Sequence, residues 1–125
     1  MQQQQRDERG VFDAASVARK IVDVAVDRKA SDVTLVEVGK VTTLADYFVI
    51  ATGNSERQLR AVANAIREAM KEDGITLLRE EGPADAGWIL LDYGQVIVHL
   101  FSEEQRAYYD LERRWVEAPT LLRIQ

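Results

Sequence analysis

The sequence predicts a single α/β domain built on a mixed sheet of about five strands flanked by helices, and three observations support this fold class. The chain has 125 residues, which fits one domain of ordinary size. Helical and strand-like patterns of apolar residues alternate in the order helix, two strands, helix, three strands, helix. No internal repeat or linker separates them. We therefore expect a flexible polar tail at residues 1–10, one domain at 11–118 and a C-terminal tail at 119–125.

The first part of the domain is predicted to hold a helix and two strands. From residue 12 to about residue 28, apolar residues recur at spacings of three and four, which is typical of an amphipathic helix, and Asp13 can cap its start. Val33–Val38 is rich in β-branched residues and reads as a strand. The continuous apolar run Tyr47–Ala51 is typical of a central strand that is covered on both faces.

The middle of the chain predicts a second helix with signals at both ends. Ser55-Glu56-Arg57-Gln58 is a capping box, in which the serine accepts from the Gln58 amide and the glutamine reaches back. Gly74 suits the C-terminal end of that helix. A short strand over Ile75–Glu80 and an acidic loop over residues 81–87 follow.

The last part predicts a hairpin and a terminal helix. Trp88–Asp92 and Gln95–Phe101 read as two strands joined by a turn at Tyr93-Gly94. A second capping box, Ser102–Gln105, opens a helix that continues through Tyr108, Leu111 and Trp115.

The hairpin is the most informative stretch because its two faces differ. A two-residue turn pairs Asp92 with Gln95, Leu90 with Ile97 and Trp88 with His99. Side chains alternate along strands, so one face is aliphatic and is expected to lie under helices; it holds Ile89, Leu91, Val96, Val98 and Leu100. The other face holds Trp88, Leu90, Asp92, Ile97, His99 and Phe101. Two interpretations of this second face stay open: a partly exposed binding surface, or a small core under the terminal helix with His99 hydrogen-bonded inside it.

Composition excludes several classes of chemistry. The chain has no cysteine, so disulfides, thiolate metal sites and cysteine nucleophiles are excluded, and its one histidine cannot build a multi-histidine metal site. No apolar run is long enough to cross a membrane and the N-terminus lacks the apolar stretch of a signal peptide, so a cytoplasmic domain is expected. A net charge of −5 disfavours a surface that grips nucleic-acid phosphates and fits a basic protein partner better.

The motifs predict neither catalysis nor a cofactor. Gly53-Asn54-Ser55 joins a strand to a helix start, but it lacks the Walker and Gly-x-Gly-x-x-Gly patterns, so turn and capping chemistry explains it. No Asp-x-Asp is present to hold Mg²⁺ for nucleotidyl transfer, and no serine lies in a Gly-x-Ser-x-Gly elbow. Arg106, Arg113 and Arg114 are explained by ion pairs along a helix.

The segments above, in their order and spacing, resemble the ribosomal silencing factor (RsfS, or Iojap) family over about residues 13–117. The resemblance rests on Asp32-x-x-Leu35-x-x-Val38, Leu44-Ala45-Asp46-Tyr47-Phe48-Val49-Ile50, Thr52-Gly53-Asn54-Ser55, Glu81-Gly82, Trp88-Ile89-Leu90-Leu91-Asp92-Tyr93-Gly94, Val98-His99-Leu100-Phe101 and Arg106-x-x-Tyr109-x-Leu111-Glu112-x-x-Trp115. It implies a nucleotidyltransferase-like sheet without the catalytic carboxylates, and a protein that is not an enzyme. It also implies binding to the large ribosomal subunit through its L-fourteen-type protein, which blocks subunit joining and represses translation under nutrient limitation.

The resemblance also implies where the partner binds and in what state the free protein exists. We expect the partner surface to lie on and around the hairpin, with carboxylates meeting basic groups of the ribosomal protein; it comprises Trp88, Leu90, Asp92, Tyr93, Ile97, His99, Glu80, Glu81 and Asp85. Tyr109, Glu112 and Trp115 are expected to lock the last helix onto the sheet. A homodimer is expected when the protein is free. Two alternatives stay open: a large-subunit assembly factor without a silencing role, and a degenerate nucleotide-binding protein using Gly53–Ser55.

Overall fold

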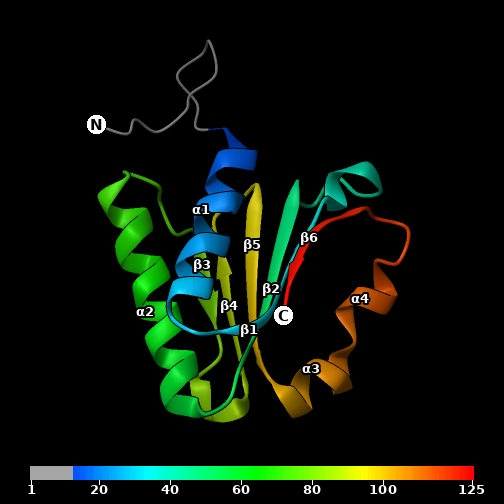
Figure 1. Ribbon diagram of the computed structural model, residues 1–125. Coiled ribbons are helices and arrows are strands. Elements are labelled where there is room, and N and C mark those ends of the chain that lie inside the picture. The colour runs from blue at the N-terminus through cyan, green and yellow to red at the C-terminus, as the bar shows by residue number, and fades with distance from the viewer. Residues whose placement is uncertain (1–12) are drawn as a thin grey trace.

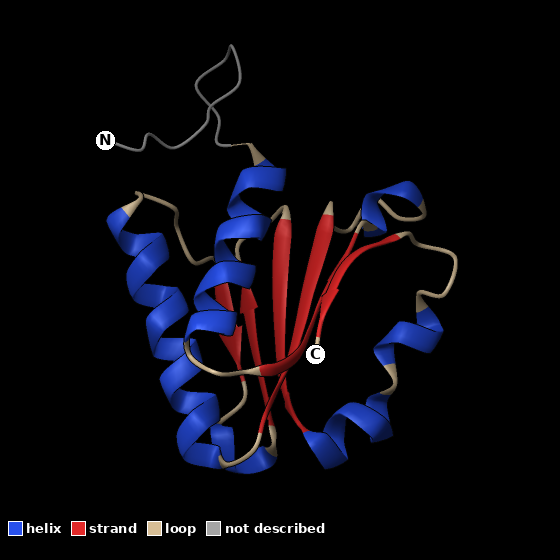
Figure 2. Ribbon diagram, in the orientation of Figure 1, coloured by secondary structure: helices blue, strands red, loops and turns tan. Residues whose placement is uncertain are grey.

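The computed structural model describes residues 13–125 and shows a mixed sheet with helices on both of its faces (Figure 1 and Figure 2). The strand order is β3-β4-β5-β2-β1-β6, in which β2 and β5 run parallel and every other neighbouring pair is antiparallel. The strands are β1 (Ser31–Val36), β2 (Tyr47–Gly53), β3 (Arg79–Glu81), β4 (Trp88–Asp92), β5 (Val96–Ser102) and β6 (Thr120–Ile124). The helices are α1 (Ala14–Asp27), α2 (Glu56–Glu72), α3 (Glu103–Tyr109) and α4 (Leu111–Arg114), with short 3-10 turns η1 (Val38–Lys40) and η2 (Ala84–Ala86).

The predicted fold class is confirmed, with one correction: the sheet has six strands, where the sequence predicted about five. The sixth strand, β6, lies within the segment 119–125 that was expected to be a tail. It pairs antiparallel with β1, and the Arg123 guanidinium binds both carboxylate oxygens of Asp32 at 2.8 and 3.0 Å. All five of its residues are exposed, so no buried alternation marks the segment as a strand. The predicted tail at residues 1–10 lies outside the described residues.

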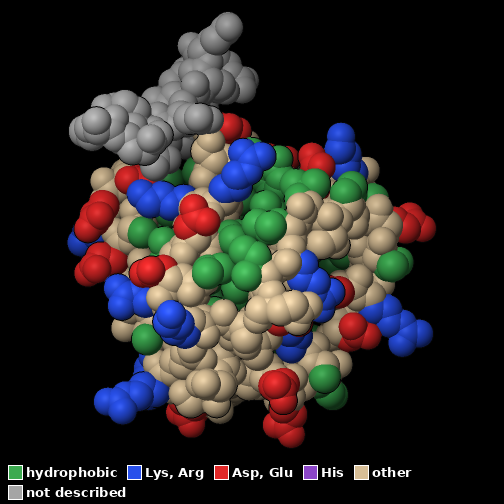
Figure 3. Space-filling view, in the orientation of Figure 1, with side chains coloured by type: hydrophobic (Ala, Val, Ile, Leu, Met, Phe, Trp, Pro, Cys, Tyr) green, Lys and Arg blue, Asp and Glu red, His purple; other side chains and the backbone are tan. Residues whose placement is uncertain are grey.

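Strand β6 forms one edge of the sheet and carries apolar side chains on the surface. Leu121, Leu122 and Ile124 are 47%, 37% and 37% exposed. Figure 3 shows apolar side chains on the surface between α1 and β6, with acidic and basic side chains interspersed around them. No helix among residues 13–125 is long and apolar enough to cross a membrane.

The helix starts follow the predicted capping chemistry. The Asp13 carboxylate accepts from the Ala15 amide, and the Ser55 and Ser102 hydroxyls accept from the amides of Gln58 and Gln105. The Gln58 side chain reaches one residue further back than a capping box requires, since it accepts from the Asn54 amide at 2.7 Å. Its amide group also donates to the Lys29 carbonyl, and this bond ties the start of α2 to the end of α1.

Helices α1 and α2 cover the aliphatic face of the sheet, as predicted. Ile21 and Ala25 of α1 and Ile66 and Met70 of α2 are fully buried against that face. The hairpin contributes its aliphatic residues to the same core, where all five are buried: Ile89, Leu91, Val96, Val98 and Leu100. Burial of this apolar surface is the main source of the domain's stability.

The hairpin register differs from the prediction by two residues. Asp92 pairs with Ile97, Leu90 with His99 and Trp88 with Phe101, so four residues separate the two members of the last pair. The longer loop is stabilised by the Asp92 carboxylate, which accepts from the Gly94 amide at 2.7 Å, and by a bond from the Tyr93 amide to the Val96 carbonyl. A shift of two residues keeps every side chain on its predicted face, because the side-chain period of a strand is two.

Two other element boundaries also differ from the prediction. Strand β3 contains only residues 79–81, because the chain before it bonds to β4 through the Leu78 amide alone and is not paired as a strand. The terminal helix is broken at Asp110, whose φ of +50° is left-handed, and it continues as the short helix α4. Periodicity alone does not reveal this break, since Asp110 is followed by residues that are all compatible with a helix.

Substitution of the glycine that follows β3 should separate steric cost from backbone strain. Gly82 has φ of +102°, and a Cβ placed on it would lie 2.0 Å from the Trp88 carbonyl oxygen, whereas Gly74 has φ of +75° and nothing within 4 Å. We expect Gly74→Ala to lower the free energy of unfolding by about 1 kcal/mol, from backbone strain alone. Gly82→Ala should cost about 3 kcal/mol or more, because the clash is with backbone. Urea unfolding followed by circular dichroism measures both, and equal costs would contradict the geometry.

Candidate partner-binding face on the hairpin

The candidate site is the side of the hairpin that faces away from α1 and α2, and we call it the hairpin face. It comprises Trp88, Leu90, Asp92, Ile97, His99 and Phe101, which the observed register places on one side of the sheet. Part of this face is covered by α3 and α4 (Figure 2), which lie across the sheet from α1 and α2. The covered and the accessible parts therefore have different roles.

The covered part is an aromatic cluster within a second, smaller core. The Trp88 ring lies 5.7 Å from that of Phe101 and 4.8 Å from that of Tyr109 on α3, and Phe48 of β2 meets the Trp115 ring at 5.4 Å. Phe101 is fully buried and Trp88 is half-buried. The structure therefore favours the small-core interpretation for this part of the face, and it supports the expected structural role of Tyr109 and Trp115.

His99 lies inside the cluster without a hydrogen bond, which corrects the expectation that it would be hydrogen-bonded there. Its ring is 4.8 Å from Phe48, edge to face, and is stacked with Trp88 and Phe101 at 6.2 and 6.0 Å. Neither ring nitrogen has a partner among the described residues, and neither does Nε1 of Trp88. Burial in this apolar environment lowers the pKa of His99 to about 4, so the imidazole is neutral at pH 7.

The accessible part of the hairpin face borders β3. Asp92 and Ile97 are partly exposed, and β3 adds Arg79 opposite Asp92 and Glu81 opposite Leu90. The Arg79 guanidinium is 3.0 Å from the Glu81 carboxylate and 3.9 Å from that of Asp92. One cation thus lies between two carboxylates, which leaves a surface of modest negative charge beside half-buried apolar side chains.

Two residues of the predicted surface lie on the opposite side of the sheet. Glu80 accepts two hydrogen bonds from Arg67 of α2, at 2.9 and 2.6 Å, and this ion pair lowers the pKa of Glu80. Tyr93 is buried against the core under α2, and burial raises its pKa to about 12. The predicted set of residues therefore does not form one continuous surface, because Glu80 and Tyr93 face α2.

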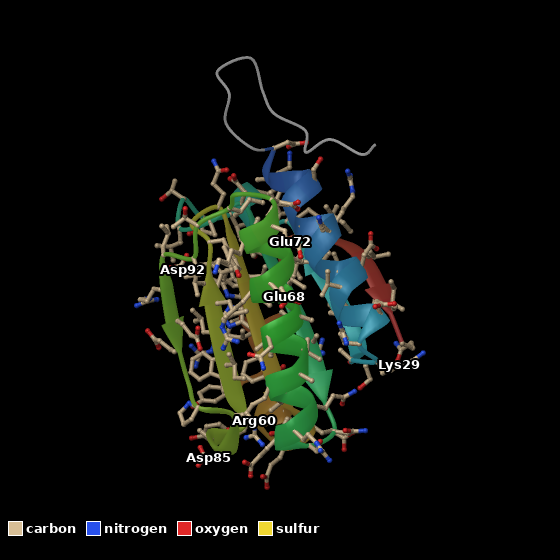
Figure 4. The ribbon with its side chains drawn as sticks, turned by 90° about the vertical axis from the view of Figure 1, so that its left-hand side faces the viewer. Lys29, Arg60, Glu68, Glu72, Asp85 and Asp92 are labelled. Carbon is tan, nitrogen blue, oxygen red and sulfur yellow. The ribbon has the colours of Figure 1, made fainter. Side chains whose placement is uncertain are left out.

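The remaining predicted carboxylate, Asp85, lies far from Asp92. Figure 4 shows the two side chains at opposite ends of the hairpin, because Asp85 is in η2 before β4 begins and Asp92 is the last residue of β4. Asp85 instead lines a hollow of about 490 Å³ at the ends of the parallel strands β2 and β5. The predicted carboxylates are thus distributed over three separate places.

That hollow occupies the position at which open α/β sheets bind nucleotides, outside the carboxyl ends of parallel strands. It begins at Gly53–Ser55, where capping bonds to Gln58 occupy the Ser55 hydroxyl and the Asn54 amide. Its lining carries carboxylates and no lysine or arginine; the carboxylates are Glu56, Asp85, Glu103 and Glu104. Among the described residues, no group of three or more His, Asp and Glu side chains is arranged to hold a metal ion. Nucleoside phosphates would meet like charge here.

The sequence predicts ion pairs along the helix for Arg106, and the structure corrects this, because its partners all lie outside α3. Its guanidinium is buried and donates to the Thr52 hydroxyl at 2.9 Å, the Thr34 hydroxyl at 3.0 Å and the Asp32 carbonyl at 2.5 Å. It also forms a bidentate ion pair with the Glu112 carboxylate through Nε and Nη2. Its carboxylate partner Glu112 follows it by six residues, a spacing that no helical pairing rule covers.

Comparison with known proteins finds one family along most of the chain. The sequence model of a family described as "Ribosomal silencing factor during starvation" matches residues 11–125. Proteins named "Ribosomal silencing factor RsfS" are 41% identical over 100 residues in Halalkalibacterium halodurans, covering 80% of this chain and 86% of that protein, and 40% identical over 93 residues in Bacillus subtilis, covering 74% and 79%. A crystal structure of a Chromobacterium violaceum protein matches with a TM-score of 0.80 at 32% identity, over 83% of this chain and 87% of that chain.

The acidic hollow predicts that nucleotides do not bind. We expect isothermal titration with ATP or GTP in the presence of Mg²⁺ to give no heat above dilution, because four carboxylates face the hollow and no lysine or arginine does. Specific binding in the micromolar range would contradict this expectation and would support the alternative of a nucleotide-binding protein.

The buried histidine predicts a pH-dependent stability. The pKa of His99 is about 4 in the folded protein and 6.5 in a model peptide, so the unfolded chain takes up the proton first as the pH falls. The stability that depends on neutral His99 is fully present above about pH 6.5, and about 3 kcal/mol of it is lost as the pH falls to 4. Urea unfolding of the wild type and of His99→Leu across this range isolates it. The variant should lose this part of the pH dependence. If the free energy of unfolding changed with pH in the same way in both proteins, the lowered pKa of His99 would be contradicted.

Proposed function

This chain belongs to the ribosomal silencing factor family, and we propose that it binds the large ribosomal subunit through the subunit's L-fourteen-type protein and blocks joining of the small subunit. The consequence would be repression of translation when nutrients are scarce. Family membership carries this proposal, because the matched residues span nearly the whole chain.

The accessible part of the hairpin face, together with the half-buried Trp88 of the aromatic cluster, supports the proposal as a contact surface. The Trp88 ring packs against Phe101 and Tyr109, while the side chain stays half-buried. A partner therefore meets an aromatic side chain whose conformation is already fixed, and binding loses little side-chain entropy. Ile97 and Asp92 lie on the same face and are partly exposed. We therefore place the contact on Trp88, Asp92 and Ile97, with Leu90 and His99 supporting them from within.

The charge next to this surface fits a basic partner. Glu81 and Asp92 flank Arg79, so the three groups together carry one excess negative charge. Charges at the rim of an interface mainly set the encounter rate and the orientation of the partner. Glu80 and Asp85 lie elsewhere, and we assign them no direct contact with the partner.

Homodimer formation in the free protein and a cytoplasmic location are also part of the proposal. Both follow from the family resemblance, and sedimentation equilibrium of the purified chain tests the first.

Binding to separated large subunits, followed by sucrose-gradient sedimentation, tests the contact surface. We expect Trp88→Ala to weaken co-sedimentation at least about 30-fold, the effect typical of a central aromatic contact of about 2 kcal/mol. Phe101→Leu is the matched control, because it disturbs the same aromatic cluster from a fully buried position. When the two variants are compared at the same fraction of folded protein, equal losses of co-sedimentation would contradict a direct role for Trp88.

The charged rim has its own matched pair. Glu81→Arg should slow association with the large subunit several-fold, and this effect should be smaller at high salt. Glu68→Arg, at an exposed position on α2, should leave association unchanged.

Adding small subunits to the same gradients then distinguishes silencing from assembly. Unimpeded subunit joining at saturating protein would overturn silencing and leave the assembly alternative.

A further inference from the structure

We propose that residues 110–117, which we name the C-terminal strap, open locally while the rest of the domain stays folded, and that opening uncovers Phe48 and the neighbouring apolar side chains of β1 and β2 beneath them. This inference concerns the free chain and goes beyond the proposed ribosomal role. Four features of the structure carry it.

Both ends of the strap are fixed to the sheet by contacts that do not involve its middle. On one side, Arg106 of α3 is held by β1 and β2 through the hydroxyls of Thr34 and Thr52. On the other side, Ala118 is buried, the Pro119 carbonyl accepts from the Glu37 amide at 2.8 Å, and β6 is paired with β1. The ends can therefore stay in place while the strap moves.

The middle of the strap is weakly held. Helix α4 has four residues, none of them buried, and it begins without a side-chain cap. The strap starts at Asp110, where φ of +50° places a residue other than glycine in the left-handed region. Val116 is 76% exposed. Segments with few buried apolar contacts open at lower free energy than the core does.

The space beneath the strap is incompletely filled. A cavity of about 100 Å³ is lined by Leu111 and Trp115 of the strap and by Phe48 and Ile50 of β2. Side chains that line a void lack dispersion contacts on that side. The strap therefore gains less from closing than a well-packed segment of the same length would.

One ion pair, between Arg106 and Glu112, holds the strap closed, and we call it the latch. When the latch breaks, Arg106 keeps its other hydrogen-bond partners. The Glu112 carboxylate accepts from Nε and Nη2 of Arg106. After opening, Arg106 still donates to the Thr34 and Thr52 hydroxyls and lies 3.7 Å from the Asp32 carboxylate. Glu112 is already partly exposed and can be solvated. Opening thus avoids leaving a buried, unpaired charge, which is the usual obstacle to breaking such a pair.

Hydrogen exchange measured by mass spectrometry tests the proposal on the full chain. We expect amides of the strap, such as that of Trp115, to exchange at least tenfold faster than amides of β5, and at a rate that low urea does not change. Local opening exposes too little surface to respond to urea. Strap amides that exchange at the rate of β5, with the same urea dependence, would overturn the proposal, because the strap would then open only by global unfolding.

Two variants that differ only in the position of the lost charge test the latch. Glu112→Gln should raise exchange in the strap about tenfold and leave β5 unchanged, whereas Glu117→Gln, an exposed position on the same strap, should change neither. In a Trp88→Phe background Trp115 is the only tryptophan of the chain. Adding Glu112→Gln should then increase the quenching of Trp115 fluorescence by acrylamide. An equal rise of exchange in strap and β5, or no rise in the strap, would overturn the latch. Neither readout involves ribosomes, so its outcome is independent of the proposed function.

Discussion

The buried guanidinium of Arg106 is the interaction on which the second layer of this protein depends. It joins β1, β2 and α3 through three oxygen acceptors and reaches α4 through Glu112. A buried arginine is tolerated only when its donors are satisfied and its charge is paired, and both conditions hold here. Because α3 and α4 contribute few buried apolar side chains of their own, this cluster of polar bonds determines where they lie on the sheet.

The two faces of the sheet consequently have different physical characters. The face under α1 and α2 is aliphatic and closely packed, with many side chains fully removed from solvent. The opposite face carries an aromatic cluster, unpartnered polar atoms and a small cavity, all of which reduce the stability of its covering layer. Stability is thus concentrated on one side of the sheet, and the other side, with aromatic groups near the surface, is the one on which we propose the partner contact.

The fold places a hollow where related architectures bind phosphates, and side-chain charge makes it unsuited to them. Two helices begin beside the ends of the parallel strands β2 and β5, a geometry that by itself favours anions. The carboxylates of Glu56, Asp85, Glu103 and Glu104 oppose that tendency. The overall charge of −5 is likewise divided among several places rather than gathered on the hairpin, and Arg67 and Arg79 pair with part of it.

The sequence by itself determined the fold class, the caps at Asp13, Ser55 and Ser102 and the two faces of the hairpin, because these follow from local periodicity and from residues a few positions apart. Only the tertiary structure decided the features that depend on distant partners. Strand β6 exists through its pairing with β1, and Arg106 finds Glu112 across a helix break that periodicity does not reveal. Likewise, Glu80 pairs with Arg67 of α2 and Tyr93 is buried in the core on that side of the sheet, whereas Trp88 packs against Tyr109 of α3. Alternation defines faces, but the placement of helices over the sheet decides which parts of a face remain accessible.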